Sequence, residues 1–274
     1  MSEKCLSLAT RRQFIKSSGI VASSAPFVTS GLLANPPSER LRHASFGAGG
    51  MAGADIGSLA RSKHFELVAV ADVDLKRAEG IRKRFPKAKF YQDWRELLDK
   101  ESKNIDSVNV STPDHMHGPI GLAAMDLGKH CYGQKPLAHN LRECRAMTEM
   151  ARENKLMTQM GIQISSAFTE RLVVSLVQSG AIGKVTRVHS FSSKKWGDMG
   201  PVPQKEDKIP EGFDWDLWLG VAKHRPYIAG YYHPGNWRKR RDFGTGTFGD
   251  MGCHIFSGWY RSLGLTSPLS VVSH

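Results

Sequence analysis

The sequence has 274 residues, 40% of them hydrophobic and 23% charged, which suits two globular domains or one large one. The formal net charge of +12 would permit an acidic partner, but the basic residues are scattered. The one dense run, Arg238 to Arg241, lacks the interleaved aromatic residues of a single-strand nucleic-acid binder and is interpreted as a solvated face. Four cysteines without a Cys-x-x-Cys pair indicate no zinc site or redox dithiol, and no run of about 18 apolar residues predicts a transmembrane helix.

Residues 1–34 have the pattern of an export signal. The segment from Thr10 to Lys16 matches the twin-arginine pattern, and a mildly apolar run with small residues follows from Gly19 to Ala34. Cleavage after Ser30 or Ala34 fits equally well, and the alternative interpretation is a basic amphipathic helix. Because this route exports folded proteins, it suits an enzyme that loads its cofactor in the cytoplasm and acts in the periplasm or otherwise outside.

A glycine-rich stretch from Phe46 to Gly53 joins an apolar run, Leu41–Phe46, to a helix-like run over residues 51–61. It has the pattern Gly-x-Gly-x-x-Ala. Gly47 allows a tight strand-to-helix turn, Gly49 lets a pyrophosphate approach the backbone, and Ala52 lets the helix pack on the strand. The helix N-terminus then offers free N–H groups to phosphates, so the stretch predicts a dinucleotide-binding turn, although alone it is a weak signal.

A second apolar run, Phe65–Ala71, ends at Asp72, which stands 20 residues after Ala52. An acid at this distance accepts hydrogen bonds from the adenosine ribose hydroxyls. The alternative is that Asp72 and Asp74 only cap the next helix. Because a carboxylate repels a 2′-phosphate, NAD is favoured over NADP, and nearby Lys76 and Arg77 leave NADP possible.

Residues 41–163 alternate strand-like and helix-like runs, which predicts a doubly wound parallel sheet, the Rossmann architecture, in the α/β class. The first strand is a poor one, since Arg42, His43 and Ser45 interrupt it. Residues 164–274 are predicted to form a second, α+β domain with a strand over 185–195 and another over 269–272. A loop of about 40 residues rich in Pro, Gly, Trp and Tyr lies between them, and loops of this length are usually functional.

Three groups of polar residues follow predicted strands or share a helix face. Thr112 and Pro113 lead from the fourth strand into Asp114, His115 and His117, which line the ligand crevice or cap the next helix. Gln134, Lys135 and Pro136 follow the fifth strand. A lysine there can stabilise a substrate oxygen as its proton leaves, with a cis bond before Pro136 possible, whereas the alternative is a surface turn.

Asp250 and His254 are four residues apart on one predicted helix face, so a carboxylate lies beside a group that titrates near neutral pH. The pair fits proton transfer from an alcohol. It also fits a buried structural pair, or a metal site for which no further ligands at suitable spacing are evident.

These motifs in this order resemble the Gfo/Idh/MocA oxidoreductase family, which includes glucose–fructose oxidoreductase and inositol dehydrogenase, from about Phe46 to the C-terminus. Three further segments resemble its exported, twin-arginine-bearing branch: 161–163, 214–220 and 236–238. The resemblance implies a mostly antiparallel second sheet that covers the nicotinamide and mediates homo-oligomers in full-length relatives. Relatives normally continue well beyond the position of His274, so the chain is expected to be C-terminally truncated and the sheet incomplete.

The resemblance also implies the site residues. The implied catalytic residues are Lys135, Asp250 and His254, and the implied substrate residues are His115, Trp237 and Arg238. The expected cofactor residues are Gly47, Gly49, Gly50, Met51, Ala52, Asp72, Thr112, Pro113, His117, Gln134, Lys135 and Gln163. Besides the early end of the chain, two residues depart from the family pattern. Gln134 replaces a usual glutamate and cannot form an ion pair with Lys135, and Ala52 replaces the third glycine of the turn, a substitution that the fold tolerates.

The expected function is oxidation or reduction of a sugar or cyclitol hydroxyl with NAD or NADP, on a small-molecule carbohydrate substrate, with no metal, nucleic acid or membrane span. One alternative is an exported glycosidase that oxidises its sugar transiently with bound NAD. The other is a truncated, non-catalytic binding protein.

Overall fold

The computed structural model describes residues 40–198 and 200–273, and the segment Arg40–His274 forms one compact unit. The predicted export signal lies outside the described residues. None of the helices in the described part of the chain is long and apolar enough to cross a membrane.

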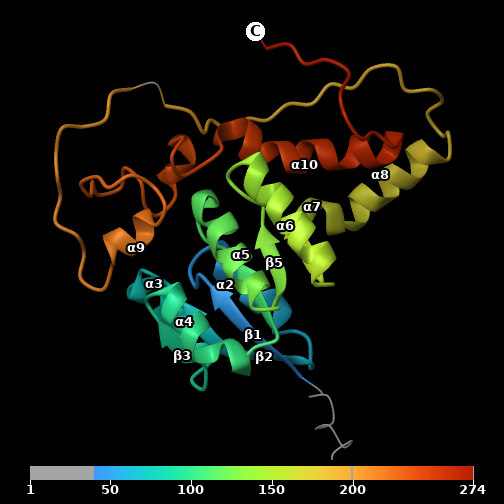
Figure 1. Ribbon diagram of the computed structural model, residues 1–274. Coiled ribbons are helices and arrows are strands. Elements are labelled where there is room, and N and C mark those ends of the chain that lie inside the picture. Colours follow the sequence, from blue (N-terminus) through green and yellow to red (C-terminus); the bar gives the residue numbers. More distant parts are fainter. Residues whose placement is uncertain (1–39, 199, 274) are drawn as a thin grey trace, which may run out of the picture. The chain divides into compact units, whose positions relative to one another are not determined.

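A six-stranded sheet with the order β3-β2-β1-β4-β5-β6 is the centre of the fold (Figure 1). All its neighbouring strands are parallel, as the alternating sequence predicts. The chain moves outward in one direction from β1 to β3 and then in the other from β4 to β6, so the two halves separate at the carboxyl ends of β1 and β4. In such sheets this separation is where ligands bind. The strands are β1 (Leu41–Phe46), β2 (Phe65–Ala71), β3 (Lys89–Tyr91), β4 (Ser107–Val110), β5 (His130–Gln134) and β6 (Thr158–Gly161).

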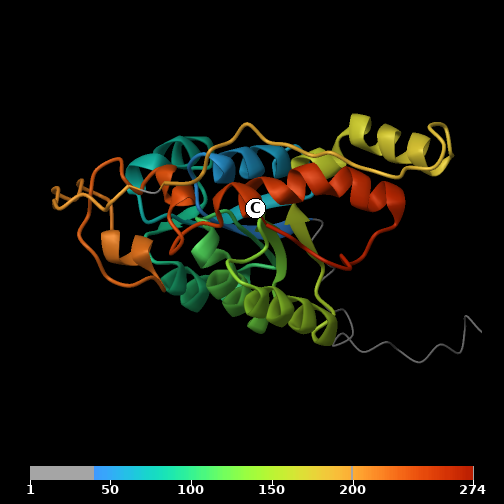
Figure 2. The same cartoon turned by 90° about the horizontal axis from the view of Figure 1, so that it is seen from above.

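Helices cover both faces of the sheet (Figure 2). One face packs against α2 (Met51–Leu59) and α3 (Leu75–Arg84) through a core that includes Ile56, Val70 and Ile81. The other face packs against α4 (Trp94–Glu101), α5 (His117–Asp126) and α6 (Leu141–Glu153) through residues such as Leu97 and Val108. This three-layer arrangement confirms the predicted α/β class. Short 3-10 turns, η1 (Ser102–Asn104) and η2 (Asp114–Met116), flank β4.

The first strand is fully formed although polar residues interrupt its sequence. The side chain of His43 is buried, and its two ring nitrogens lie 2.8 Å from Ser107 Oγ and 3.0 Å from Asn109 Oδ1 on β4. Ser45 Oγ donates to the carbonyl of Gly47 at 2.7 Å. Buried polar groups are tolerated when each finds a hydrogen-bond partner, and here the neighbouring strand and the following turn supply them.

Residues after β6 form helices and irregular segments: α7 (Gln163–Ser166), α8 (Phe168–Gln178), α9 (Trp215–Leu219), η3 (Asn236–Lys239) and α10 (Gly246–Leu263). The helix α10 lies across the carboxyl edge of the sheet (Figures 1 and 2). Hydrogen bonds join it to α8, where Ser257 Oγ donates to Glu170 Oε1 at 2.8 Å.

The predicted strands over 185–195 and 269–272 are wrong, because both segments are irregular. The alternation of apolar and polar residues indicated a strand, yet Phe191 is 89% exposed. A strand needs a neighbouring strand to satisfy its backbone groups, and within 164–273 the described residues form none. The predicted antiparallel sheet is therefore not formed in the described part of this segment.

The long loop rich in aromatic residues has a core of its own, which we call the aromatic cluster. Phe243 lies at its centre, fully buried, with its ring centroid 4.8 Å from that of Trp218 and 5.0 Å from that of His115. The aromatic cluster contains Phe213, Trp215, Trp218, Leu219, Tyr227, Ile228, Tyr232, Trp237 and Phe243. Burial of these nine large side chains stabilises a segment that has little regular structure.

Candidate active site

The glycine turn between β1 and α2 leaves room where a phosphate would lie. Gly47 has a φ of +101°, and a Cβ there would come within 2.7 Å of the carbonyl oxygen of Ser111. A Cβ on Gly49 would come within 2.7 Å of the guanidinium of Arg77. Gly50, the N-cap of α2, makes no side-chain capping bond. The first N–H groups of α2 are therefore without a side-chain cap, as a pyrophosphate site requires, and the turn fits a dinucleotide.

Asp72 lies directly beside this turn. Its carboxylate accepts hydrogen bonds from the backbone N–H groups of Ala48 at 2.8 Å, Gly49 at 3.4 Å and Asp74 at 2.9 Å. Burial raises the pKa of Asp72 above its ordinary value, and these three hydrogen bonds oppose the rise. Asp72 is therefore held at the end of β2, close to where a ribose bound by this turn would lie. Arg77, which the sequence linked only to a 2′-phosphate, lies against Gly49 and Gly50.

A cleft lies beside the glycine turn, and the long loop that carries the aromatic cluster forms its opposite wall. Its backbone pairs with the chain after β2, since the N–H of Asp214 donates to Val73 O at 2.9 Å and that of Leu75 to Gly212 O at 2.9 Å. His233 Nε2 lies 3.1 Å from the Asp74 carboxylate, and its ring stacks on Phe213 at 4.8 Å.

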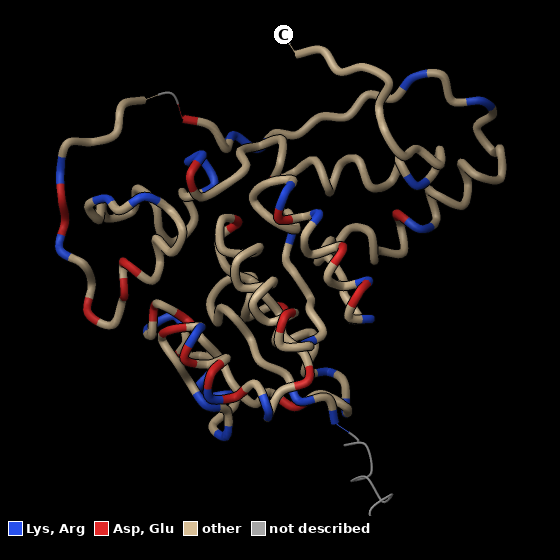
Figure 3. Tube along the Cα trace, viewed as in Figure 1, with Lys and Arg blue, Asp and Glu red and all other residues tan. Residues whose placement is uncertain are grey.

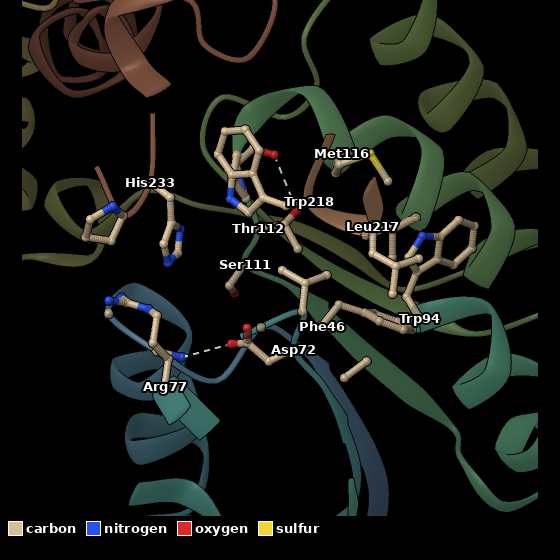
Figure 4. A pocket seen from close by; sticks show the side chains of 18 of the residues that line it. Phe46, Asp72, Arg77, Trp94, Ser111, Thr112, Met116, Leu217, Trp218 and His233 are labelled. Carbon is tan, nitrogen blue, oxygen red and sulfur yellow. Dashed lines mark hydrogen bonds between the residues drawn. The ribbon is translucent and has the colours of Figure 1, made fainter. Parts of the chain in front are cut away.

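The resulting cleft has a volume of about 210 Å³. In Figure 4, Asp72 and Arg77 lie on one side, and His233 and Trp218 lie on the other. Trp218 on α9 and His233 and Pro234 in the loop after it contribute to its lining. The sequence marks 214–220 only as a segment that resembles the exported branch and assigns none of the three residues to the site. Of the expected cofactor and substrate residues, those lining the cleft are Gly47, Gly49, Gly50, Met51, Asp72, Thr112, Pro113, Trp237 and Arg238.

Lys135 and Asp250 form an ion pair at the edge of the cleft. Lys135 Nζ lies 2.5 Å from Asp250 Oδ1, and the two side chains are 11% and 7% exposed. Arg238, which lines the cleft, places its Nε 3.4 Å from the same carboxylate oxygen. Burial alone would raise the pKa of Asp250, but the hydrogen bond and charge of Lys135, together with Arg238, lower it below the ordinary value. The bond between Lys135 and Pro136 is cis.

His254 follows Asp250 by one turn of α10 and is half-buried. Burial lowers its pKa, and the positive charge of Lys135 lowers it further, while Asp250 opposes both effects. The ring is therefore neutral at pH 7 and able to accept a proton. The helical spacing predicts that Asp250 orients the ring of His254, but its carboxylate bonds other side chains. Among the described residues the Asp250 side chain bonds Lys135 and Arg238, because two cations attract a carboxylate more strongly than a neutral ring does.

Gln134 forms a hydrogen-bond network that the sequence did not indicate. Its Nε2 donates to both carboxylate oxygens of Asp55 on α2, at 3.1 and 2.9 Å, and its Oε1 accepts from the backbone N–H of Lys135 at 3.3 Å. Ser111 Oγ donates to Asp55 at 2.7 Å. Burial raises the pKa of Asp55, and the bonds from Ser111 and Gln134 oppose the rise. A half-buried carboxylate thus bonds the residue that precedes Lys135, even though residue 134 is a neutral amide.

His115 and His117 are buried and support neighbouring loops. His117 Nδ1 lies 2.7 Å from Pro136 O, and its Nε2 lies 2.8 Å from Thr112 O, so the ring ties together the turns after β4 and β5. His115 packs in the aromatic cluster, with Nε2 3.2 Å from the carbonyl oxygens of Trp218 and Leu219. Neither ring lines the cleft.

The remaining expected residues lie nearby. Ala52 is fully buried on α2, as close helix packing requires, and Gln163 Nε2 lies 3.8 Å from Met51 Sδ. Asp114 accepts from Thr245 Oγ1 at 2.9 Å. Among the described residues no cluster of three or more His, Cys, Asp or Glu could hold a metal ion.

A doubly wound sheet with a glycine turn and an acid at its switch point defines a dinucleotide-binding Rossmann protein. A family model described as an oxidoreductase family with an NAD-binding Rossmann fold matches residues 41–162. A second model, the C-terminal alpha/beta domain of the oxidoreductase family, matches residues 168–271. Together they span the chain from 41 to 271 except for five positions, so the chain belongs to the Gfo/Idh/MocA family of NAD-binding oxidoreductases.

The names of individual relatives describe different activities, a dehydrogenase and a glycosidase. The levoglucosan dehydrogenase of Pseudarthrobacter phenanthrenivorans is 26% identical over 127 residues, which are 46% of this chain and 32% of that protein. The alpha-N-acetylgalactosaminidase of Shewanella oneidensis is 27% identical over 203 residues, 64% of this chain and 44% of that protein. The chain therefore spans less than half the length of these relatives.

Among solved structures, the myo-inositol 2-dehydrogenase of Lactobacillus plantarum superposes with a TM-score of 0.50. The two sequences are 24% identical, and the superposed region covers 53% of this chain and 43% of the dehydrogenase chain. At this identity the likeness supports the fold.

Proposed function

We propose that this protein oxidises or reduces a hydroxyl group of a sugar or cyclitol with NAD as its redox partner. The observation that carries the proposal is the meeting of Lys135 and Asp250 at the edge of the dinucleotide cleft, with His254 one helical turn away. Lys135 directly follows β5, whereas Asp250 and His254 lie on α10, more than a hundred positions later in the sequence. A basic ring, a lysine and a carboxylate gathered at the edge of this cleft fit proton transfer from an alcohol.

The fit of NAD rests on the glycine turn. The N–H groups at the start of α2 would hold the pyrophosphate, Asp72 would accept from the ribose hydroxyls, and the Arg77 guanidinium would lie beside the phosphates. The cofactor, when bound, supplies the acceptor or donor of hydride at the substrate carbon. The negative charge of Asp72 favours NAD over NADP, and the nearby Arg77 keeps NADP as a second coenzyme to be tested.

The chain's own residues handle the proton. In the oxidative direction His254 accepts the hydroxyl proton, because its lowered pKa keeps the ring neutral. Lys135 lies where a cation stabilises the developing alkoxide oxygen. Asp250 holds Lys135 in place through the 2.5 Å contact, and Arg238 shares that carboxylate.

The test combines coenzyme binding with turnover in the purified full-length chain. Lys135→Ala is expected to abolish turnover on a panel of sugars and cyclitols and to leave NAD affinity within about twofold, because Lys135 does not line the cleft that the glycine turn borders. The matched control is Lys87→Ala, an exposed lysine on the connection between α3 and β3. Unchanged turnover in Lys135→Ala would refute the role of Lys135, and no affinity for either nicotinamide coenzyme would refute the function.

A second candidate is a glycosidase that oxidises its sugar with bound NAD, eliminates the aglycone and then reduces the sugar again. It is favoured by the alpha-N-acetylgalactosaminidase relative, which aligns with more of this chain than the levoglucosan dehydrogenase does. The same residues would serve both reactions. Release of an aglycone without net coenzyme reduction would support the glycosidase, and net reduction would support the dehydrogenase.

Export by the twin-arginine route is also part of the proposal. It rests on the segment from Thr10 to Lys16. Replacing Arg11 and Arg12 together by lysine should retain the protein in the cytoplasm, as measured by cell fractionation. Unchanged export of that double variant would contradict the assignment.

A further inference from the structure

A second, more open cavity adjoins the dinucleotide cleft at Arg238. Its volume is about 590 Å³, and it lies between the chain after β5 and the start of α10. Arg238 lines both cavities, and its Nε lies 3.4 Å from Asp250, the partner of Lys135. The second cavity, which we call the basic groove, is lined by His139, Asn140, Arg238, Lys239, Arg241, Gly244, Thr245 and Gly246.

The basic groove has an excess of positive charge. Arg238 and Lys239 are the last two residues of η3, and Arg241 lies in the turn after it. Figure 3 marks in blue the positions of Lys and Arg along the described chain. Among the described residues, neither Lys239 nor Arg241 forms an ion pair, and the groove lining contains no acidic residue.

The acids around the basic groove are already bound by other partners. Asp198 pairs with Arg240 at 2.8 Å, Asp242 pairs with Arg225, and Asp250 pairs with Lys135. Glu143 accepts from the backbone N–H of His139 at 3.1 Å. Each of these carboxylates is engaged by another group, although the positive charge of Lys239 also helps to lower the pKa of Asp198. The lining of the groove keeps an excess of cations, and the sequence run interpreted as a solvated face borders a cavity.

The start of α10 adds hydrogen-bond donors to the same place. Its N-cap, Thr245, makes no capping bond, because its hydroxyl donates to Asp114 instead. Gly246, the first residue of this 18-residue helix, lines the groove. Cationic side chains beside uncapped N–H groups favour an anion.

We infer that the substrate carries an anionic group, a carboxylate or a phosphate, and that the basic groove binds it while the reacting hydroxyl faces Lys135 and His254. This inference rests on the proposed function and narrows its substrate class to sugar acids or sugar phosphates. Arg238 lines both cavities and bonds Asp250, the partner of Lys135, so a ligand in the basic groove contacts a residue that also borders the dinucleotide cleft. Lys239 and Arg241 determine specificity, since they lie away from the Lys135–Asp250 pair.

The test measures binding by isothermal titration calorimetry on the full-length protein with saturating NAD. The ligands are matched pairs, glucose with glucuronate and galactose with galacturonate, together with glucose 6-phosphate. We expect each acid to bind at least about fivefold more tightly than its neutral partner at low ionic strength, with the preference falling as salt is added. Tighter binding of glucose 6-phosphate than of the uronates would identify a sugar phosphate as the ligand. Tighter binding of the uronates would identify a sugar acid.

The variants Lys239→Gln and Arg241→Gln should each reduce the preference for the acid about threefold and leave affinity for the neutral sugar unchanged. Lys87→Gln, with the same change of charge at a distant exposed site, should have no effect. The inference is overturned if neutral and acidic sugars bind equally, if none of the anions binds, or if both groove variants keep the full preference. A separate titration with NAD alone tests the proposed function. If NAD does not bind, the preference for acidic sugars can still be measured on the protein without coenzyme, so failure of the proposed function and failure of this inference are distinguishable.

Discussion

The contact between Lys135 and Asp250 leads to an asymmetric prediction for stability. Asp250→Asn removes the carboxylate and leaves Lys135 and Arg238 side by side without an anion between them. Lys135→Met removes the lysine charge but leaves Asp250 beside Arg238, 3.4 Å away. Losing one partner of a buried ion pair costs about 3–5 kcal/mol in general. Some water reaches this pair, since the side chains are 11% and 7% exposed.

We therefore expect Asp250→Asn to lower the free energy of unfolding by about 2–4 kcal/mol, and Lys135→Met by only about 1–2 kcal/mol. Urea unfolding followed by tryptophan fluorescence measures both. The matched control is Asp216→Asn, whose side chain is 80% exposed, and it should change stability by less than about 0.5 kcal/mol. An equal or larger cost for Lys135→Met would refute the idea that Arg238 shares the carboxylate.

The sign of the pH dependence follows from the lowered pKa of Asp250. A carboxyl whose pKa is lower in the folded state than in the unfolded state stabilises the fold fully above the unfolded value, about 3.9. This stabilisation is lost as the pH falls from there through the folded value. The difference between the wild type and Asp250→Asn should therefore be constant from pH 7 to pH 5 and narrow below pH 4.

Three further predictions concern the fold around the site. Gly47→Val should destabilise the protein by more than about 2 kcal/mol and abolish NAD binding in a fluorescence titration, because φ is +101° and a Cβ would lie 2.7 Å from Ser111 O; normal NAD affinity would argue against this turn as the phosphate site. Burial lowers the pKa of His43 to about 4, so the free energy of unfolding should fall as the pH drops below 6.5, by about 3 kcal/mol near pH 4. Urea titrations of His43→Gln should show a correspondingly weaker pH dependence. Phe243→Ala should cost about 3–5 kcal/mol in the same assay, because the ring is fully buried in the aromatic cluster, and a cost below 1 kcal/mol would mean that the cluster is not a cooperative core.

The Rossmann half was readable from the sequence because its information is local. β1 and β2 begin and end where their apolar runs do, at Leu41–Phe46 and Phe65–Ala71. β2 is the largely apolar segment expected of a parallel strand buried on both faces, whereas polar residues interrupt β1. The glycine turn and helix caps lie within a few residues of the elements they end. Asn140 caps α6, with its side chain accepting from the N–H of Glu143 at 3.0 Å.

Only the tertiary structure decided which residues meet across long stretches of chain. Helical spacing suggested that Asp250 acts on His254, but Lys135, 115 positions earlier, binds the carboxylate instead. Asp55 and Gln134 are 79 positions apart, and no pattern in either segment relates them. The competition between partners for a buried charge depends on all the groups that surround it, and spacing along one helix records only the nearest of them.

The sequence by itself determined the sheet, the glycine turn and the acid at the end of β2, since periodicity and turn chemistry fix each of them locally. The tertiary structure decided that the aromatic segment forms a wall of the cleft, that residues 185–195 form no strand, and that the basic run at Arg238 borders a cavity. Each of these outcomes depends on the surface that a segment packs against, which the segment's own residues do not specify.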